Sequence, residues 1–498
     1  MVPVLASLVA LVSSPELMAL ITVAVLTGAV FGAMPGIGGK VALVLLIPLA
    51  YGMDATAGAV FLLAMHSVVH TGSAIPSILC GVPGTGPSAA TVVDGYPMAQ
   101  HGEAGRAIGA SLAASGAGGV IGALALALML PIIGPLILAF GPPEMFLLAI
   151  LGITFIATLS GKSLLKGLIV GCFGLMLAFV GMDPQTGVAR FSFGQLFLWD
   201  GVDLVTAILA FFAIPEVIAL GIRGGSISAL DRRAANYSFA QVLTGMADVF
   251  RHRWLTLRAS VIGVVIGIIP GLGAEAAAWL CYGHAVQSSP APERFGQGAV
   301  EGVIAPEAAN NSKEGGALLP TLFFGIPGSS GMALMLGAFV MLGIQPGPQL
   351  MQTGMDLVWT LIWTLVIANL LCVVVLLALA RWLGLIAFIP GSFVIPFVLI
   401  FALLGSWLSS GSWESLVLLL VFGVLGCAFK REGWPAPPLA IGLVLGGIAE
   451  VSLHRTLAIW GPEAFLRPLS LALIGLILAS MTLSLRRRRK VQLAPDAA

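Results

Sequence analysis

The sequence predicts an all-α integral membrane protein made of two homologous halves, judged from its composition, its long apolar runs and an internal repeat. Of its 498 residues, 58% are hydrophobic and only 9% are charged, whereas a soluble globular protein carries about 25% charged residues. A soluble chain of this length could not bury so much apolar surface, so lipid must solvate the surplus. We expect about 12 transmembrane helices, some of them broken by Gly and Pro or re-entrant.

The apolar runs identify the spanning elements as helices. Residues 357–380 and 416–429 form long apolar segments, unlike the alternating segments of about ten residues in a membrane β-barrel. Because backbone polar groups in hydrocarbon must be satisfied within the chain, helices are the remaining solution.

A polar, basic stretch divides the chain near its middle. Residues 224–254 cannot span a membrane, and arginines gather in and beside them: Arg223, Arg232, Arg233, Arg251, Arg253 and Arg258. A second basic cluster, residues 486–490, lies near the C-terminus. The positive-inside rule predicts that both regions are cytoplasmic. We therefore expect an N-terminal membrane half at 1–222, a basic cytoplasmic linker at 223–257, a second membrane half at 258–485 and a basic cytoplasmic tail at 486–498.

The two halves share motifs rich in Gly and Pro. Pro35-Gly36-Ile37-Gly38-Gly39-Lys40 matches Pro270-Gly271-Leu272-Gly273-Ala274-Glu275. A longer match aligns Gly72, Pro76, Gly81, Pro83, Gly84 and Thr85 without gaps with Gly316, Pro320, Gly325, Pro327, Gly328 and Ser329. A weaker match pairs residues 167–171 with 442–446. Prolines and glycines that agree in register indicate a duplication.

These motifs predict where a ligand binds. Proline lacks an N–H and glycine tolerates unusual backbone angles, so together they break a helix, and broken segments repeated in both halves are typical of secondary transporters. A half-helix that begins there presents free N–H groups and a positive dipole end, which suit a carboxylate. Simple kinks or close packing are the alternative. The expected substrate-binding residues are Gly36, Gly38, Pro83, Gly84, Thr85, Gly271, Gly273, Asn310, Asn311, Pro327, Gly328, Ser329 and Ser330.

Three ionisable residues are candidates for ion coupling or for a charge pair. Lys40 and Glu275 follow the two matched Pro-Gly turns, and charged residues inside a membrane are costly and often functional. They either pair across the halves or reach water separately. Glu307 lies in a polar stretch between the Gly/Pro breaks of the second half, for which an ordinary solvent loop is the alternative.

Motifs for catalysis are missing from the sequence. It contains no Walker A motif, no H-E-x-x-H and no nucleophile elbow, so we predict neither a catalytic residue nor a cofactor. His66 and His70 are one helical turn apart, but no third ligand is near in sequence. Packing or cavity lining is therefore favoured over a metal site. Without a P-loop, accumulation of a solute would draw on an ion gradient or on a partner.

Several longer motifs resemble those of the large membrane subunit of tripartite tricarboxylate transporters. They are Pro83-Gly84-Thr85 with residues 90–99 and 102–106, residues 293–298 and 301–311, residues 315–328, residues 343–348, residues 181–187 with Arg190, Phe191, Phe193 and Gly194, and residues 433–446. The resemblance extends from about residue 28 to residue 455. Lys40, Glu275 and the segment His70-Thr71-Gly72-Ser73 depart from the small or apolar residues usual at these places in the family.

The resemblance implies a multi-pass permease of the bacterial inner membrane. Such a permease works with a periplasmic solute-binding protein and a small membrane subunit, and imports citrate or another tri-, di- or aromatic carboxylate. A proton or sodium gradient drives the import. A passive channel or a non-transporting sensor subunit is the alternative, and an intramembrane enzyme is a weaker one.

The distribution of charge also bears on topology. If both basic regions are cytoplasmic, the second half crosses the membrane an even number of times. No basic residue precedes Lys40, so positive charge does not hold the N-terminus inside. We favour a periplasmic Met1 and an inverted repeat, because opposed half-helices would then converge on one central site. A parallel repeat is the alternative.

Overall fold

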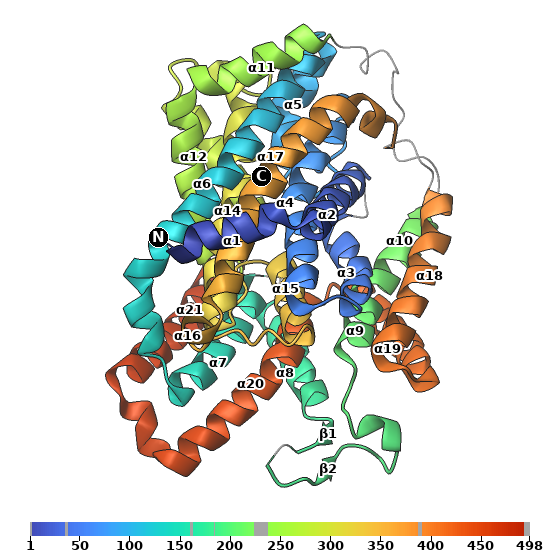
Figure 1. Ribbon diagram of the computed structural model, residues 1–498, viewed down its shortest axis with the longest axis vertical. Coiled ribbons are helices and arrows are strands. Elements are labelled where there is room, and N and C mark those ends of the chain that lie inside the picture. The colour runs from blue at the N-terminus through green and yellow to red at the C-terminus, as the bar shows by residue number, and fades with distance from the viewer. Residues whose placement is uncertain are drawn as a thin grey trace.

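The computed structural model describes residues 2–34, 38–159, 163–183, 185–223, 238–386 and 391–492, and almost all of its regular structure is helical (Figure 1). The first half contains α1 (Val2–Ser13), α2 (Pro15–Ala33), α3 (Gly38–Tyr51), α4 (Ala55–Cys80), α5 (Ala89–Gln100), α6 (Ala104–Leu138), α7 (Pro142–Leu159), α8 (Leu164–Ala178), β1 (Gly181–Met182), β2 (Ala189–Arg190), η1 (Leu196–Leu198), α9 (Leu204–Ile208), η2 (Leu209–Ala213) and α10 (Ile214–Arg223).

The second half contains α11 (Phe239–Arg251), α12 (Arg253–Ile268), α13 (Gly273–Ser288), η4 (Pro292–Arg294), α14 (Glu301–Phe324), α15 (Ser330–Met341), α16 (Leu350–Thr353), α17 (Met355–Ile386), α18 (Gly391–Ser410), α19 (Trp413–Arg431), α20 (Pro437–Ile459), η5 (Pro462–Leu466) and α21 (Pro468–Gln492). The all-α prediction is confirmed.

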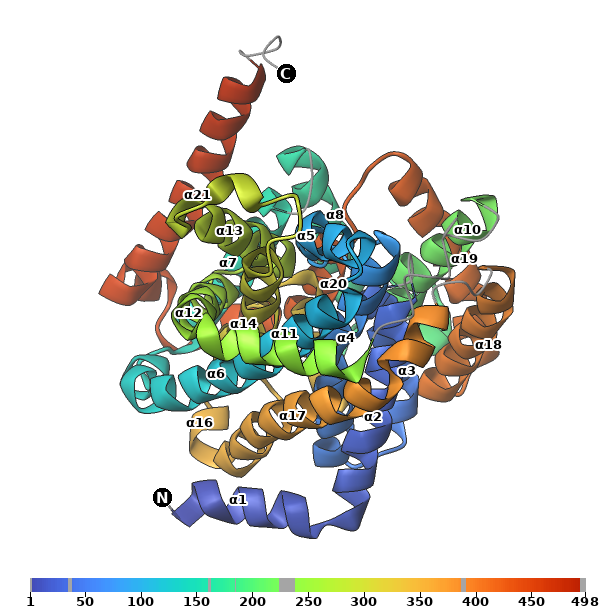
Figure 2. The ribbon, with the colours of Figure 1, turned by 90° about the horizontal axis from the view of Figure 1, so that it is seen from above.

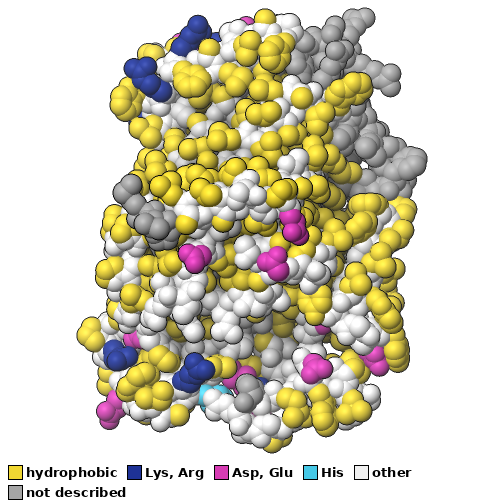
Figure 3. Space-filling view, in the orientation of Figure 1, with side chains coloured by type: hydrophobic (Ala, Val, Ile, Leu, Met, Phe, Trp, Pro, Cys, Tyr) yellow, Lys and Arg dark blue, Asp and Glu magenta, His cyan; other side chains and the backbone are white. Residues whose placement is uncertain are grey.

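Six of the described helices are long and apolar enough to cross a membrane: α2, α4, α6, α17, α19 and α20. Shorter apolar helices accompany them, and hydrophobic side chains cover much of the face in Figure 3. The chain is therefore a multi-pass membrane protein. The expected number of about 12 transmembrane helices stays a prediction.

The helices α4 and α14 lie at the centre of the bundle. In the view of Figure 2 they are surrounded by the other helices, and nearly every side chain of both helices is buried. Each is the core helix of its own half, and each carries the first part of the longer repeated motif.

Glycines at matched positions of the two predicted halves make equivalent contacts. A Cβ added at Gly28 of α2 would lie 2.6 Å from the carbonyl oxygen of Met65 in α4, and one added at Gly263 of α12 would collide with that of Ala309 in α14. These glycines let the two backbones of each pair approach closely. The pair α2 and α4 is thus packed like the pair α12 and α14.

The two core helices also end alike. The left-handed residue Gly81 (φ 63°) terminates α4, and Gly325 (φ 64°) terminates α14. Glycine adopts this conformation at little cost, which makes it a common helix C-cap. The repeated P-G-[ST] loop follows directly in each half, so the matched glycines stop the helix where the loop begins.

The two segments of the weaker sequence match, residues 167–171 and 442–446, also contact each other. A Cβ at Gly442 of α20 would collide with the carbonyl oxygen of Gly171 in α8. The matching segments of the two halves therefore pack against each other.

Part of the predicted basic linker is helical. Helix α11 lies wholly inside it and α12 begins there, at Arg253. Helix α11 packs against α6: a Cβ at Gly245 would collide with the carbonyl oxygen of Arg106, and the Arg106 guanidinium lies 2.6 Å from Asp248. In Figure 1, α11 caps the end of the molecule opposite to β1 and β2. The domain boundaries themselves stay predictions.

Candidate binding site between the two halves

A cavity of about 370 Å³ lies where the repeated motifs of both halves meet. The first half contributes the start of α3, the core helix α4, the P-G-T loop and the region of η2 and α10. The second half contributes the starts of α13 and α15 and one residue of α14. The lining residues are Gly38, Gly39, Lys40, Val41, His66, His70, Pro83, Gly84, Thr85, Gly86, Pro87, Phe212, Glu216, Ala274, Glu275, Lys313, Ser329, Ser330 and Gly331.

Eight of the residues selected from the sequence line this cavity: Gly38, Lys40, Pro83, Gly84, Thr85, Glu275, Ser329 and Ser330. Four others lie beside it without lining it: Gly271, Gly273, Pro327 and Gly328. The Gly271 N–H donates to the Gly328 carbonyl oxygen at 3.1 Å, so the second turn is joined to the second loop. Gly36 lies outside the described residues.

Helix N-termini border the cavity. Helix α3 starts at Gly38 (φ 67°) and α13 starts at the equivalent Gly273 (φ 74°). Helix α15 starts at Ser330, and the Ser329 hydroxyl caps it by accepting from the Met332 N–H at 3.2 Å. The first N–H groups of a helix have no intrahelical acceptor, and the helix dipole is positive there. The cavity is therefore suited to an anion.

Two ion pairs carry the charges at the rim of the cavity. Lys40 Nζ lies 3.8 Å from Glu275 Oε1, and each side chain is 48% exposed. These two residues come from different halves. Glu216 Oε2 lies 2.5 Å from Nζ of Lys430. Two arrangements were considered for Lys40 and Glu275: a pair across the halves, or separate contact with water. In this geometry the two side chains face each other across the halves.

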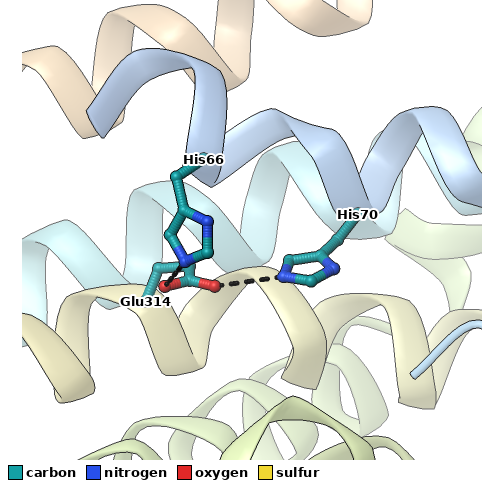
Figure 4. Close-up of side chains that lie close together, drawn as sticks. All are labelled: His66, His70 and Glu314. Atoms are coloured by element: carbon teal, nitrogen blue, oxygen red, sulfur yellow. Dashed lines mark ion pairs between the residues drawn. The ribbon is translucent and has the colours of Figure 1, made fainter. Parts of the chain in front are cut away.

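A buried cluster of four ionisable side chains forms the deep part of the site (Figure 4). His66 Nε2 lies 3.5 Å and His70 Nε2 lies 3.3 Å from the two carboxylate oxygens of Glu314. The Lys313 ammonium lies 2.6 Å from Glu314 and 3.5 Å from the Ser329 hydroxyl. The cluster thus joins α4, α14 and the P-G-S loop of the second half.

The cluster was not among the site residues selected from the sequence, although the repeat contains a signal for it. In the gap-free alignment of the longer motif, Gly72 corresponds to Gly316. His70 and Glu314 each lie two residues earlier, so they occupy the same position of the two halves. Residues at equivalent positions near the crossing of the two core helices are expected to meet.

A third possible ligand lies near His66 and His70 in three dimensions, although none is near them in sequence, and both histidines line the cavity, as one of the favoured interpretations predicted. A nitrogen of each histidine and a carboxylate oxygen of Glu314 all lie within 4.8 Å of one another. However, the Lys313 ammonium already contacts this carboxylate at 2.6 Å. A metal cation would have to displace it against charge repulsion, so the arrangement favours proton and anion chemistry.

The remaining predicted residues lie in α14, away from the cavity lining. The Asn311 amide donates to Thr71 Oγ1 at 2.8 Å and to Asn369 Oδ1 at 2.7 Å. Glu307 is buried and accepts from Thr91 at 2.5 Å and from Ser115 at 2.9 Å. Asn310 is buried, and its side-chain amide has no hydrogen-bond partner among the described residues. These groups lie on the same core helix as Lys313 and Glu314 without lining the cavity.

A cavity formed by helix N-termini and Gly/Pro loops, inside a bundle of apolar helices, is the arrangement of a membrane transport protein. The chain belongs to the tripartite tricarboxylate transporter TctA family, whose family model matches residues 18–441. It is therefore a subunit of a tripartite tricarboxylate transporter, as the motifs predicted.

Two relatives come from Agrobacterium vitis. An uncharacterized 52.8 kDa protein in the TAR-I ttuC' 3' region is 32% identical over 467 residues, which are 93% of this chain and 92% of the relative. An uncharacterized protein in the TAR-II ttuC' 3' region is 35% identical over 227 residues, which are 45% of this chain and 93% of the relative. No solved structure matches the chain.

Proposed function

We propose that this chain is the permease subunit of a binding-protein-dependent secondary transporter that imports a carboxylate across the bacterial inner membrane. The observation that carries the proposal is the cavity between the halves, because helix N-termini and lysines from both halves surround it. A tri-, di- or aromatic carboxylate is the class of solute that such donors bind. A periplasmic solute-binding protein delivers it, and a small membrane subunit completes the complex.

The energy for import comes from a proton or sodium gradient. The chain contains no nucleotide-binding motif, and the proposed cycle requires no cofactor apart from the coupling ion. The charged residues at the cavity, Lys40 and Glu275 among them, are the groups through which substrate charge and ion charge can be balanced. Glu307, which lies apart from the cavity, is a second candidate for ion coupling.

We further propose that the repeat is inverted. Helices α6 and α17 follow the P-G-[ST] loops of their respective halves, and both are candidate spans. Where they pack, Gly116 faces Val373 and Gly119 faces Asn369, so residue numbers rise along one helix and fall along the other. The opposite directions of this one equivalent pair support an inverted repeat.

Uptake in intact cells tests the proposed function. A strain without its own carboxylate uptake would express the chain with its neighbouring genes and receive labelled citrate, succinate or benzoate. Accumulation of at least one probe is expected. It should collapse when an ionophore dissipates the ion gradients while ATP remains.

The alternatives predict other results. Accumulation that persists without ion gradients would point to an ATPase partner. Flux that needs neither a gradient nor the binding protein would indicate a passive channel. A failure to take up any carboxylate, with the protein present in the membrane, would support a sensor subunit.

A further inference from the structure

The fixed charges around the cavity cancel. Lys40 pairs with Glu275, Lys430 with Glu216, and Lys313 with Glu314. Three cations therefore face three carboxylates, and the cavity has no net charge while both histidines are neutral. An incoming carboxylate brings negative charge that these pairs leave uncompensated.

His66 and His70 are the titratable groups available to balance that charge. Their side chains are only 3% and 10% exposed, yet both line the cavity. Three of the four ring nitrogens have no hydrogen-bond partner among the described residues: both nitrogens of His66, and Nδ1 of His70. An unaccompanied imidazolium is costly in such a buried place, whereas one beside an added carboxylate is stabilised by it.

We propose that His70, with its Nε2 facing Glu314, binds the coupling proton together with the substrate, and that the coupling ion of this transporter is H⁺. His66 is the second imidazole of the same site. This inference rests on the proposed transport function and identifies the ion for it.

The cluster is chemically suited to a proton rather than to Na⁺. Hard cations prefer a shell of oxygen ligands, whereas this cluster offers two imidazoles and one carboxylate. That carboxylate already contacts the Lys313 ammonium at 2.6 Å. A proton needs only one free nitrogen lone pair, and His70 provides it.

The proton balance follows from the charges. In the empty cavity the imidazole of His70 is neutral and Glu314 is neutralised by Lys313. When a substrate carboxylate enters from the periplasm, one proton from the same side binds an imidazole nitrogen and forms imidazolium, so one negative charge of the substrate is compensated. In the cytoplasm the substrate leaves, and the imidazolium releases its proton there. By linkage, each ligand raises the affinity for the other.

Transport in proteoliposomes tests this assignment. The full chain would be reconstituted with its small membrane subunit, with the binding protein outside, Na⁺ absent and the membrane potential clamped. The probe is the carboxylate that is taken up in the cell assay, from citrate, succinate and benzoate. For one coupled proton, an inside-alkaline gradient of one pH unit should raise accumulation about tenfold.

The variant His70→Gln should separate exchange from coupling. Its counterflow of labelled substrate at equal pH should be slower, because the substrate charge is no longer balanced, and its steady-state accumulation in response to the pH gradient should fall from about tenfold to about onefold. His101→Gln is the matched control, because His101 is exposed and lies beyond the end of α5. It should retain both activities. A His70→Gln protein that still accumulates substrate about tenfold would overturn the proposal.

A measurement on the unaltered protein guards against a variant that fails to fold. A pH dye in the lumen should report acidification when substrate is added without any gradient. No acidification during substrate entry, or accumulation that follows a Na⁺ gradient alone, would refute His70 as the proton site and leave the transport function standing. Absence of any substrate flux would instead refute the proposed function.

Discussion

Gly84 and Gly328 hold the same place in the two halves, and each lies against the backbone of a neighbouring helix. A Cβ at Gly84 would collide with the carbonyl oxygen of Gly32 and lie 2.9 Å from Ser73 Cβ. A Cβ at Gly328 would collide with the carbonyl oxygen of Gly267 and lie 2.7 Å from Ala317 Cβ. A side chain at either position must push the loop toward the cavity.

We expect Gly84→Val and Gly328→Val each to reduce uptake at least about fivefold, since overpacking of this kind costs about 1–3 kcal/mol. Membrane insertion should be unaffected, because it depends on the apolar spans. Gly283→Val is the matched control, as no atom lies within 4 Å of the Cβ position at Gly283. Labelled carboxylate uptake and membrane immunoblots measure the two effects. Normal uptake by both loop variants would contradict a role for these loops in binding.

At the scale of the elements, Asp94 joins α5 of the first half to the loop that precedes α14. Its Oδ1 accepts from the N–H groups of Gly296, Gly298 and Ala299 at 2.8–2.9 Å. Its Oδ2 accepts from the Tyr282 hydroxyl at 2.9 Å. Gly296 (φ 82°) and Gly298 (φ 107°) adopt backbone angles that favour glycine. The contact positions the start of α14, the helix that carries Lys313 and Glu314.

Asp94→Ala should lower the thermal unfolding temperature strongly. It leaves three backbone donors without an acceptor, each at a cost of about 1–3 kcal/mol if it stays buried. Asp94→Asn retains an acceptor oxygen and should be milder, and Tyr282→Phe should cost about 1 kcal/mol because it removes a single bond. Thermal unfolding of the purified proteins in detergent ranks the three. Equal stability of Asp94→Ala and Tyr282→Phe would mean that the loop does not depend on Asp94.

At the scale of the whole molecule, the halves are interlocked. The core helix α4 of the first half packs against α17 of the second, and α14 of the second half packs against α6 of the first. Each half therefore completes the other, and the cavity exists only where both meet. The orientation of this assembly in the membrane follows from the basic regions and from the inverted repeat that we propose.

Cysteine labelling tests that orientation. In a background without the five native cysteines, single cysteines at residues 2, 235 and 495 would be exposed to an impermeant thiol reagent on intact spheroplasts. We expect labelling at residue 2 only, because the positive-inside rule predicts that the basic linker and tail face the cytoplasm. Permeabilised cells, in which all three should react, are the control. Labelling at residue 235 would reverse the orientation, whereas protection at residue 2 would exclude only the inverted repeat.

Much of the architecture could be predicted without coordinates. Composition is enough to specify a helical membrane protein, since lipid solvation depends on how many apolar residues follow one another. The matched motifs around Gly84 and Gly328 were enough to locate the loops that line the cavity, because Gly and Pro act on the local backbone. The family followed from the same motifs.

The tertiary structure decided which of the candidate side chains meet. His66 and His70 have no ligand near in sequence, and Glu314 reaches them only because α4 and α14 cross at the centre of the bundle. The same packing keeps Asn311 and Glu307 off the cavity lining, although the sequence suggested substrate binding for Asn311 and ion coupling or a charge pair for Glu307. Crossing angles depend on the close packing of many side chains at once, so no single motif encodes them.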